Sequence, residues 1–216
     1  MHANTKGPWA VILADVVGSG RTRGVRSLLA ARLRAATSAH LKPGRIRLPY
    51  AVTAGDEFQT VAGDLLQIPE LLFDLRRRLH PLQLRIGVGI DAIPGPLRAP
   101  VNQLTGAAFE HARTAIDEAK DARAHAVKTT RFHSANQQFD LLANLIYSLH
   151  DALVGRLSEK QWRTVDAYLE KGRVDLAARA LKIDASTASR NLSRGHLWES
   201  LETIEGMKKL IAASFQ

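Results

Sequence analysis

The stretch Pro8–Gly20, PWAVILADVVGSG, decides how the first half of the chain is interpreted. Its apolar run over Trp9–Val16 is typical of a short strand buried on both faces. One acid, Asp15, interrupts the run near its end, and the glycine-rich turn Gly18-Ser19-Gly20 follows. An ionised carboxylate is costly to bury without partners. The end of this strand therefore carries either a capping residue or an acid with a chemical role.

Strand-like and helix-like patterns follow in a regular order. They predict a helix over residues 21–40, a strand over 45–53, a hairpin turn at Ala54-Gly55-Asp56, a strand over 57–63, a helix over 66–79 and a strand over 82–91. This is the βαββαβ order of a ferredoxin-like α+β domain. In the last strand, Gly87 and Gly89 indicate a close approach of another backbone. A further helix over 105–120 and a strand over 127–133 complete this half.

From Ser134 onward the periodicity is helical throughout. We expect three parts: a ferredoxin-like domain over residues 1–133, a connecting helix within 134–157, and an all-α helix-turn-helix domain over 158–216. In the last part, Ser158 and Gln161 form a capping-box pattern, Gly172 ends the first helix, and Asp184 is placed to cap the third.

Composition narrows the class of protein and its partners. The chain has 216 residues, 45% of them hydrophobic and 24% charged, and it has no cysteine, which excludes disulfides and thiolate metal sites. No apolar run approaches the roughly 20 residues of a membrane span, and we expect a cytoplasmic protein without a membrane partner. The formal charge of +9 favours polyanionic partners. Residues 16–55 carry eight basic and no acidic side chains, whereas residues 158–216 are nearly balanced.

The βαββαβ topology brings two acids together. Its two central strands are the first and the third, so Asp15, which ends the first, and Asp56, which begins the third, are expected to be neighbours. Two adjacent carboxylates repel unless a cation lies between them. Mg²⁺ (or Mn²⁺) with a nucleotide fits this arrangement, because Mg²⁺ is held by one or two carboxylates plus substrate phosphates. Each acid taken alone also fits a cap or turn role.

Two motifs carry a resemblance to known families. The segment ILADVVGS, residues 12–19, resembles the metal-binding first strand of class III nucleotide cyclases, and AGDEF, residues 54–58, resembles the hairpin of GGDEF-type diguanylate cyclases. Together with LRIGVGID, residues 84–91, and the helix-turn-helix tail, the chain most resembles the SatD family.

The resemblance implies roles for particular residues. They are metal ligation by Asp15, Asp56, Glu57 and the carbonyl of Val16, phosphate contact by Gly18, Ser19 and Lys120, and a catalytic role for Arg113. The asparagine of the cyclase site would fall at Phe109 or Glu110, which lack an amide. The resemblance therefore favours metal and nucleotide binding over turnover, and it implies a homodimer.

The tail resembles a different set of proteins, the sigma-factor-like and replication-regulator helix-turn-helix domains. Lys182 stands at the turn glycine of that pattern and Ala188 at its valine. If the resemblance holds, the third helix enters the DNA major groove. Base edges or phosphates would be contacted by Ser186, Thr187, Ser189 and Arg190, and the DNA backbone by Arg179, Lys182 and Arg194.

Three functions remain open from the sequence. The first is a DNA-binding transcriptional regulator whose cyclase-like domain senses a metal–nucleotide ligand. The second is an active nucleotidyl cyclase with a helix-turn-helix accessory domain. The third is a protein-interaction module in which both parts have lost their original activity.

Overall fold

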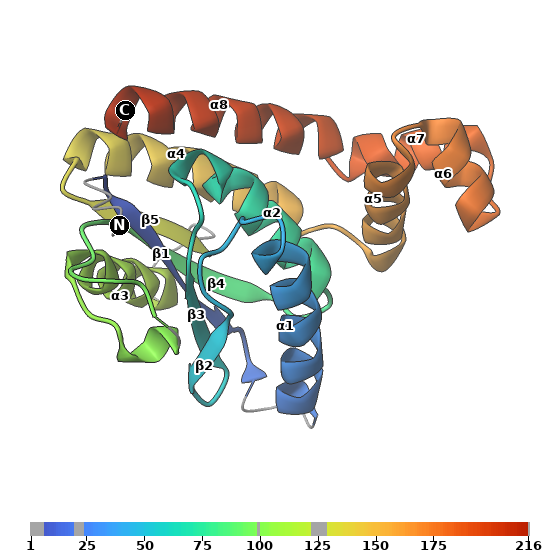
Figure 1. Ribbon diagram of the computed structural model, residues 1–216. Coiled ribbons are helices and arrows are strands. Elements are labelled where there is room, and N and C mark those ends of the chain that lie inside the picture. Colours follow the sequence, from blue (N-terminus) through green and yellow to red (C-terminus); the bar gives the residue numbers. More distant parts are fainter. Residues whose placement is uncertain (1–6, 20–23, 99, 122–128, 216) are drawn as a thin grey trace.

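A five-stranded mixed sheet forms the centre of the computed structural model, which describes residues 7–19, 24–98, 100–121 and 129–215 (Figure 1). The strands are β1 (Trp9–Val16), β2 (Ala51–Ala54), β3 (Glu57–Val61), β4 (Leu84–Asp91) and β5 (Thr130–Ser134). The helices of the first part are α1 (Val25–Leu41), α2 (Ile68–Leu79), α3 (Ala107–Lys120) and α4 (Gln137–Val154), with short 3-10 turns η2 (Leu65–Gln67) and η3 (Val101–Gln103). Those that follow are α5 (Glu159–Lys171), α6 (Val174–Leu181), α7 (Ala185–Arg194) and α8 (Leu197–Phe215).

The strand order in space is β2-β3-β1-β4-β5. The pairs β1–β3, β1–β4 and β2–β3 are antiparallel, and β5 runs parallel to β4 at the edge. The first four strands with α1 and α2 thus follow the predicted βαββαβ order. The strand expected over 45–53 is shorter than predicted, because β2 begins only at Ala51 and Ile46 forms an isolated bridge with Ala62. Pro49 lies between them and has no backbone N–H to donate.

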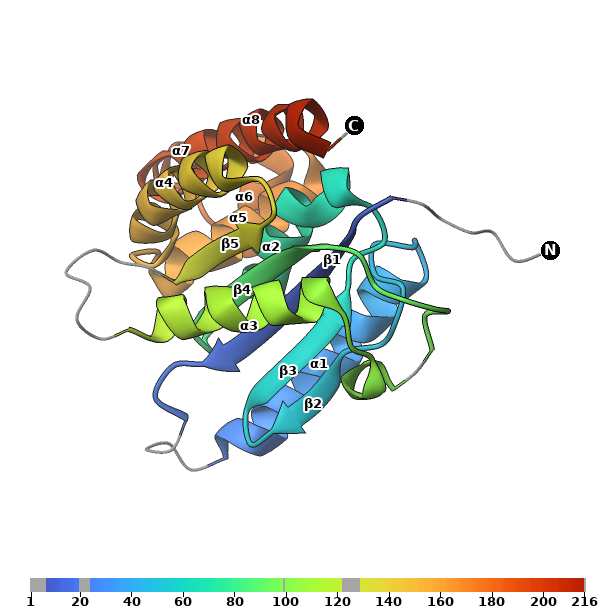
Figure 2. The same cartoon turned by 90° about the vertical axis from the view of Figure 1, so that its left-hand side faces the viewer.

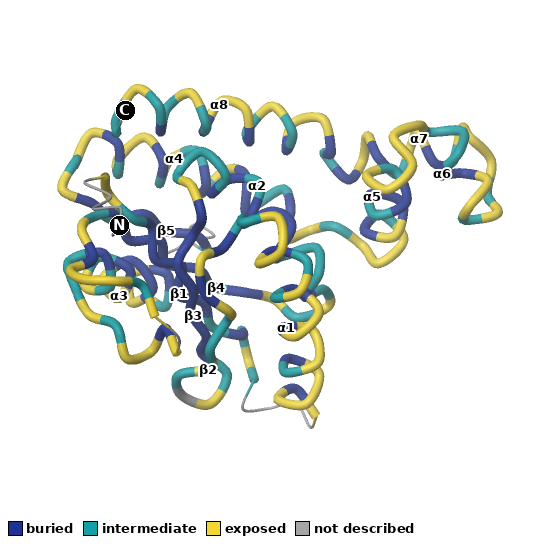
Figure 3. The backbone as a smooth tube through the Cα atoms, viewed as in Figure 1, coloured by how far each residue is buried: buried dark blue, intermediate teal, exposed yellow. Residues whose placement is uncertain are grey.

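Alternate residues of β1 face two different cores. Ile12 and Ala14 lie in the larger one, with apolar residues of α1, α2, α4 and α8. Val11 and Leu13 lie in the smaller one, with apolar residues of α3. Figure 2 shows α3 on one side of the sheet, and Figure 3 shows β1, β3, β4 and β5 largely buried, whereas β2 at the edge is more exposed. Asp15 follows Leu13 by two residues and therefore faces the α3 side.

Glycines on β4 let α3 approach the sheet closely. A Cβ atom on Gly89 would lie 2.1 Å from the carbonyl oxygen of Ala108, and one on Gly87 would lie 2.5 Å from that of Ala112. Both distances are far below a van der Waals contact. The close approach predicted from the Gly-x-Gly spacing is therefore confirmed, and its partner is α3.

The helices after residue 158 share a third core cluster, in which Trp162, Val165 and Leu192 pack together with Phe73 of α2 and Val154 of α4. Ser158 and Gln161 make the complete capping box, and Gly172 adopts the left-handed conformation at the end of α5. Lys182 also lies in the left-handed region, with φ 55°, in the turn between α6 and α7.

Helix α8 leaves this cluster and runs back along α4 (Figures 1 and 2). Its residues Met207 and Ile211 are buried in the larger core, and the ring of Phe215 packs against Phe139 of α4. The last part of α8 therefore packs in the core of the sheet domain. The expected limits had placed these residues in a separate domain over 158–216.

Helix α4 presents an apolar face to solvent, with Leu141, Leu145 and Leu149 each more than half exposed. Its opposite face is buried. Among the residues that the structure describes, no helix is long and apolar enough to cross a membrane.

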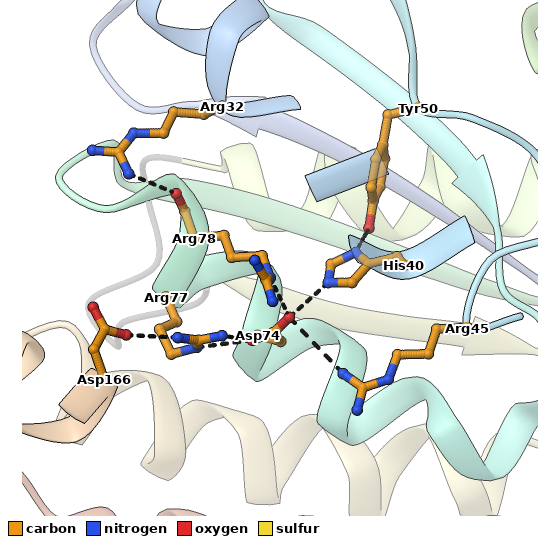
Figure 4. A network of polar contacts seen from close by, with 8 residues as sticks. All are labelled: Arg32, His40, Arg45, Tyr50, Asp74, Arg77, Arg78 and Asp166. Atoms are coloured by element: carbon orange, nitrogen blue, oxygen red, sulfur yellow. Dashed lines mark hydrogen bonds and ion pairs between the residues drawn. The ribbon is translucent and has the colours of Figure 1, made fainter. Parts of the chain in front are cut away.

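A polar network joins α1, α2 and α5 around the carboxylate of Asp74 (Figure 4). His40 Nε2 lies 2.7 Å from Asp74 Oδ2, and its Nδ1 lies 2.9 Å from the hydroxyl of Tyr50. Arg77 and Arg78 donate to Asp74 over 2.8 Å and 2.5 Å from their Nε atoms, and Arg45 Nη1 lies 3.9 Å from it.

Arg77 also reaches the neighbouring helical cluster. Its Nη1 donates to Asp166 Oδ1 of α5 over 2.8 Å, while its Nε and Nη2 atoms donate to Asp74. This guanidinium therefore links α2 to α5.

Candidate functional site

Three strands bring the acids of the candidate site to one end of the sheet. In the register of β1 with β3, Ala14 lies opposite Phe58, so Asp15 at the end of β1 lies next to the turn that carries Asp56. Gly55, with φ 63°, allows this tight turn. Burial raises the pKa of Asp15, and the nearby charge of Asp56 raises it further. The two acids that the topology was expected to bring together are thus close enough to interact.

Two cations lie beside Asp15. Arg85, directly opposite Asp15 on β4, places Nη1 3.5 Å from Asp15 Oδ2, and Lys120 at the end of α3 places Nζ 3.7 Å from the same oxygen. Both cations lower the pKa of Asp15, but burial is the largest influence and the net direction is upward. The proton affinity of this carboxyl group is therefore higher than that of an ordinary aspartate.

The pKa of Glu57 is shifted in the opposite direction from that of Asp15. Arg113 donates to both of its carboxylate oxygens, over 2.9 Å and 2.8 Å, and Lys120 donates over 3.2 Å. Thr53 adds a hydroxyl hydrogen bond of 3.1 Å. Burial raises the pKa of Glu57, but these donors outweigh it and the net pKa is lowered. Glu57 is thus ionised and already paired with two cations.

Asp56 differs from both neighbours because one of its oxygens has no partner. Oδ2 is buried and accepts no hydrogen bond. A buried, unsatisfied carboxylate oxygen is uncommon in a folded protein and calls for an explanation. Within the described residues no cluster of three or more His, Cys, Asp or Glu side chains is arranged to hold a metal, so the protein side chains offer at most a two-carboxylate arrangement here.

The predicted phosphate-contacting turn begins where β1 ends. Val16 is buried as the last residue of β1, and Gly18 is exposed with φ 71°, a conformation that favours glycine. Ser19 is half-buried, and Gly20 lies outside the described residues. The turn therefore starts directly beside Asp15 and leaves space around Gly18, where an added Cβ would meet nothing within 4 Å.

An open groove of about 610 Å³ runs beside these residues, between α3 and the sheet. Arg113 and Phe109 of α3 line it, together with Thr53 of β2 and Asn102 of η3. Phe109 and Glu110, the two positions at which the cyclase asparagine would fall in the resemblance, both line it and neither offers an amide. Asn102 brings an amide into the same groove from a different element.

Sequence reasoning missed Arg85 and Asn102 as residues of this site. A signal for Arg85 was present. The strand order makes β4 a neighbour of β1, and the register then pairs Asp15 with Arg85. The signal for Asn102 was absent, since its loop is placed by tertiary packing alone.

The residues predicted to contact DNA lie on α6, on α7 and in the turn between them. On α7, Ala188 and Leu192 are buried, whereas Ser186, Ser189 and Arg190 are exposed and Thr187 is half-buried. The Arg190 guanidinium donates to the carbonyl of Ser186 and to the hydroxyl of Thr187, both over 3.3 Å. The remaining predicted contacts are also exposed: Arg179, Lys182 and Arg194.

Solved structures of several kinds are similar to the chain. A bacterial light-regulated adenylyl cyclase matches with 10% identity and a TM-score of 0.39, covering 58% of this chain and 75% of that chain. A regulator of polyketide synthase expression from Bifidobacterium adolescentis matches with 13% identity and a TM-score of 0.30, covering 95% and 86%. A Csm1–Csm4 cassette in complex with pppApA matches with 16% identity and a TM-score of 0.36, covering 97% of this chain but only 36% of that chain.

These likenesses, all with TM-scores below 0.5, carry no argument about function. The curated proteins include no match. A family model matches residues 11–196, a range that contains the two acids, the groove beside α3 and both helices α6 and α7. The chain therefore belongs to the SatD family.

Proposed function

We propose that this protein is a DNA-binding regulator whose sheet domain binds a nucleotide through a divalent metal ion. The observation that carries the proposal is the pair Asp15 and Asp56, with a buried Asp56 oxygen that lacks any hydrogen-bond partner. A divalent cation there would satisfy that oxygen and relieve the repulsion between the two carboxylates. Mg²⁺ or Mn²⁺ suits oxygen ligands of this kind.

The residues present fit such an ion without Glu57. Asp15 and Asp56 would hold it together with the carbonyl of Val16, and the ion would neutralise negative charge on bound phosphates. Lys120 lies within reach of Asp15 and Glu57, and it would exchange these contacts for a phosphate group. Arg113 is exposed at the groove and ion-paired with Glu57, which places a second cation on the same side. The turn at Gly18 and Ser19 would supply backbone N–H groups.

The metal–nucleotide proposal predicts a ligand-dependent stabilisation that needs both acids. A nucleoside triphosphate with Mg²⁺, at a hundredfold excess over its Kd, is expected to raise the free energy of unfolding by about 2.7 kcal/mol. Asp15→Asn and Asp56→Asn should reduce this gain to near zero, because each removes a charged ligand. Thermal unfolding with each nucleotide, with and without the metal, measures it.

The matched control is Glu118→Gln, which removes an exposed carboxylate from α3. This variant should keep the full ligand response. An equal response in the Asp15 and Asp56 variants would show that any nucleotide binds elsewhere and would refute the proposed site.

A second candidate function, nucleotide cyclisation, is favoured by one observation. Asn102 lines the groove together with Arg113, so an amide is available even though Phe109 has none. Chromatographic analysis of products after incubation with each nucleoside triphosphate and Mg²⁺ or Mn²⁺ separates the two functions. Turnover that is lost in Asp15→Asn and in Asn102→Ala supports the enzyme, and binding without product supports the regulator.

The DNA-binding part of the proposal rests on the exposed face of α7. Arg190→Ala is expected to weaken duplex binding by roughly tenfold or more, since a side chain that contacts a base is worth about 1–3 kcal/mol. We propose that a homodimer presents two such helices, because the nearly balanced charge of residues 158–216 favours only weak binding by one copy. Fluorescence anisotropy with labelled duplex at two salt concentrations measures the effect.

Arg34 on α1 provides the comparison for Arg190. It is an exposed arginine of the basic segment 16–55 and lies outside the helical cluster. Arg34→Ala should leave duplex binding nearly unchanged. Weaker binding by Arg34→Ala combined with normal binding by Arg190→Ala would assign DNA binding to the basic segment and refute the role of α7.

A further inference from the structure

A second cavity, of about 310 Å³, lies where the sheet domain meets α5. It is bounded by the end of α2, the start of β4, the end of α4 and the first turn of α5. Leu84 lines it and belongs to the larger core, whereas the next residue, Arg85, faces Asp15. The cavity is therefore on the opposite face of the sheet from the carboxylate pair. Its volume is at the small end of the range for ligand pockets, about 300–1,000 Å³.

The cavity contains a buried carboxylate with a free oxygen. Asp151 of α4 lines it, and its side chain is fully buried, with Oδ1 3.3 Å from Arg76 Nη2 and 3.1 Å from the hydroxyl of Thr130. Oδ2 has no hydrogen-bond partner. Burial raises the pKa of Asp151, but the charge of Arg76 and neighbouring donors outweigh burial, so the net pKa is lowered and the group is a carboxylate at neutral pH. Oδ2 is thus an acceptor that a ligand N–H could satisfy.

The rest of the lining offers a cation and aromatic rings. Arg156, in the loop after α4, is exposed and makes no ion pair or hydrogen bond through its side chain with any described residue. The rings of His80 and Trp162 form one side of the cavity, with their centroids 5.8 Å apart. A buried acceptor, an exposed cation and two aromatic rings in one lining define a ligand with three matching features.

We propose that this cavity binds a small planar heteroaromatic anion whose N–H group donates to Asp151 and whose negative group pairs with Arg156. Purine nucleoside monophosphates have this chemistry. The bound ligand would contact α2 and β4 on one side and α5 on the other, in addition to the Arg77–Asp166 ion pair that already links them. It would therefore stabilise one position of the helical cluster relative to the sheet. The proposal does not depend on the metal site or on DNA binding.

Isothermal titration calorimetry of the full chain with adenosine monophosphate, guanosine monophosphate and inorganic phosphate tests this inference. At least one heteroaromatic anion is expected to bind in the absence of metal, and inorganic phosphate is expected not to bind. Arg156→Ala should weaken that binding about tenfold or more through loss of a charged hydrogen bond. Ala152→Met should abolish it, because a longer apolar side chain on the cavity lining fills the space.

Asp151→Asn removes the charge beside Arg76 and should also abolish binding, but it can disturb folding. The variants at Arg156 and Ala152 leave that buried pair intact and keep the test decisive. Arg163→Ala, which removes an exposed arginine of α5 that does not line the cavity, is the matched control and should bind as the parent does.

Three results would overturn the inference. They are no binding of any heteroaromatic anion, binding of inorganic phosphate with the same affinity, and binding that survives Ala152→Met but is lost in Asp15→Asn. The last result would place the ligand at the carboxylate pair. It would therefore support the proposed metal–nucleotide site while refuting this second one.

Discussion

Asp74→Asn is expected to lower the free energy of unfolding by about 3–5 kcal/mol, the usual cost of removing one partner from a buried group of charges. Asp74 accepts hydrogen bonds from Arg77 and Arg78 and lies against His40. An asparagine keeps the shape but cannot balance these cations, so their mutual repulsion is left uncompensated. Urea unfolding of the parent and the variant at pH 7 measures the difference.

The contribution of Asp74 to the free energy of unfolding is also expected to depend on pH. Burial raises the pKa of Asp74, but its hydrogen bonds from His40 and Arg78 and the charge of Arg77 outweigh burial and hold the pKa far below the ordinary value of 3.8. A lowered carboxyl pKa gives stability that is complete above the unfolded value and is lost as the pH falls below it. The difference between parent and Asp74→Asn should therefore be constant near neutrality and shrink below about pH 4.

Asp166→Asn tests how much the exposed ion pair with Arg77 contributes to stability, apart from the buried carboxylate of Asp74. Asp166 is about half exposed and contacts only Arg77 in this network, so the variant should lose no more than about 1 kcal/mol. Equal losses in the two variants would mean that the stability resides in the link to α5 and not in the buried carboxylate.

Gly89→Ala is expected to destabilise the fold by about 3 kcal/mol or more, because the added Cβ overpacks a backbone contact that cannot yield locally. That Cβ would lie 2.1 Å from the Ala108 carbonyl oxygen and 2.2 Å from the Ala112 nitrogen. This clash is relieved only if the whole of α3 moves away from β4. That movement would expose the residues of the smaller core. Thermal and urea unfolding of the variant measure the loss.

Gly206→Ala is the matched control for this glycine. Gly206 lies inside α8, and an added Cβ there would meet nothing within 4 Å. The substitution should stabilise the protein by about 1 kcal/mol, the difference in helix propensity between the two residues. If Gly89→Ala were as harmless as Gly206→Ala, the close packing of α3 on β4 would be wrong.

The predicted parts of the candidate site followed from local pattern and topology. Asp15 and Asp56 could be paired because the βαββαβ order makes their strands neighbours, and that order follows from periodicity and from the Gly55-Asp56 turn. The network of Asp74 could not be predicted in this way. It depends on His40 from α1 and Asp166 from α5, which no pattern within α2 specifies.

Periodicity and turn chemistry act over a few residues, so the sequence by itself determined the βαββαβ order of the elements, the close approach at Gly87 and Gly89, the capping box at Ser158 and the left-handed turn at Lys182. Tertiary structure alone decided that α8 returns to pack on α4 and that a cavity opens around Asp151. These features depend on how separate elements meet in space. Contacts of that kind arise from the packing of the whole chain and leave no signature in any one segment.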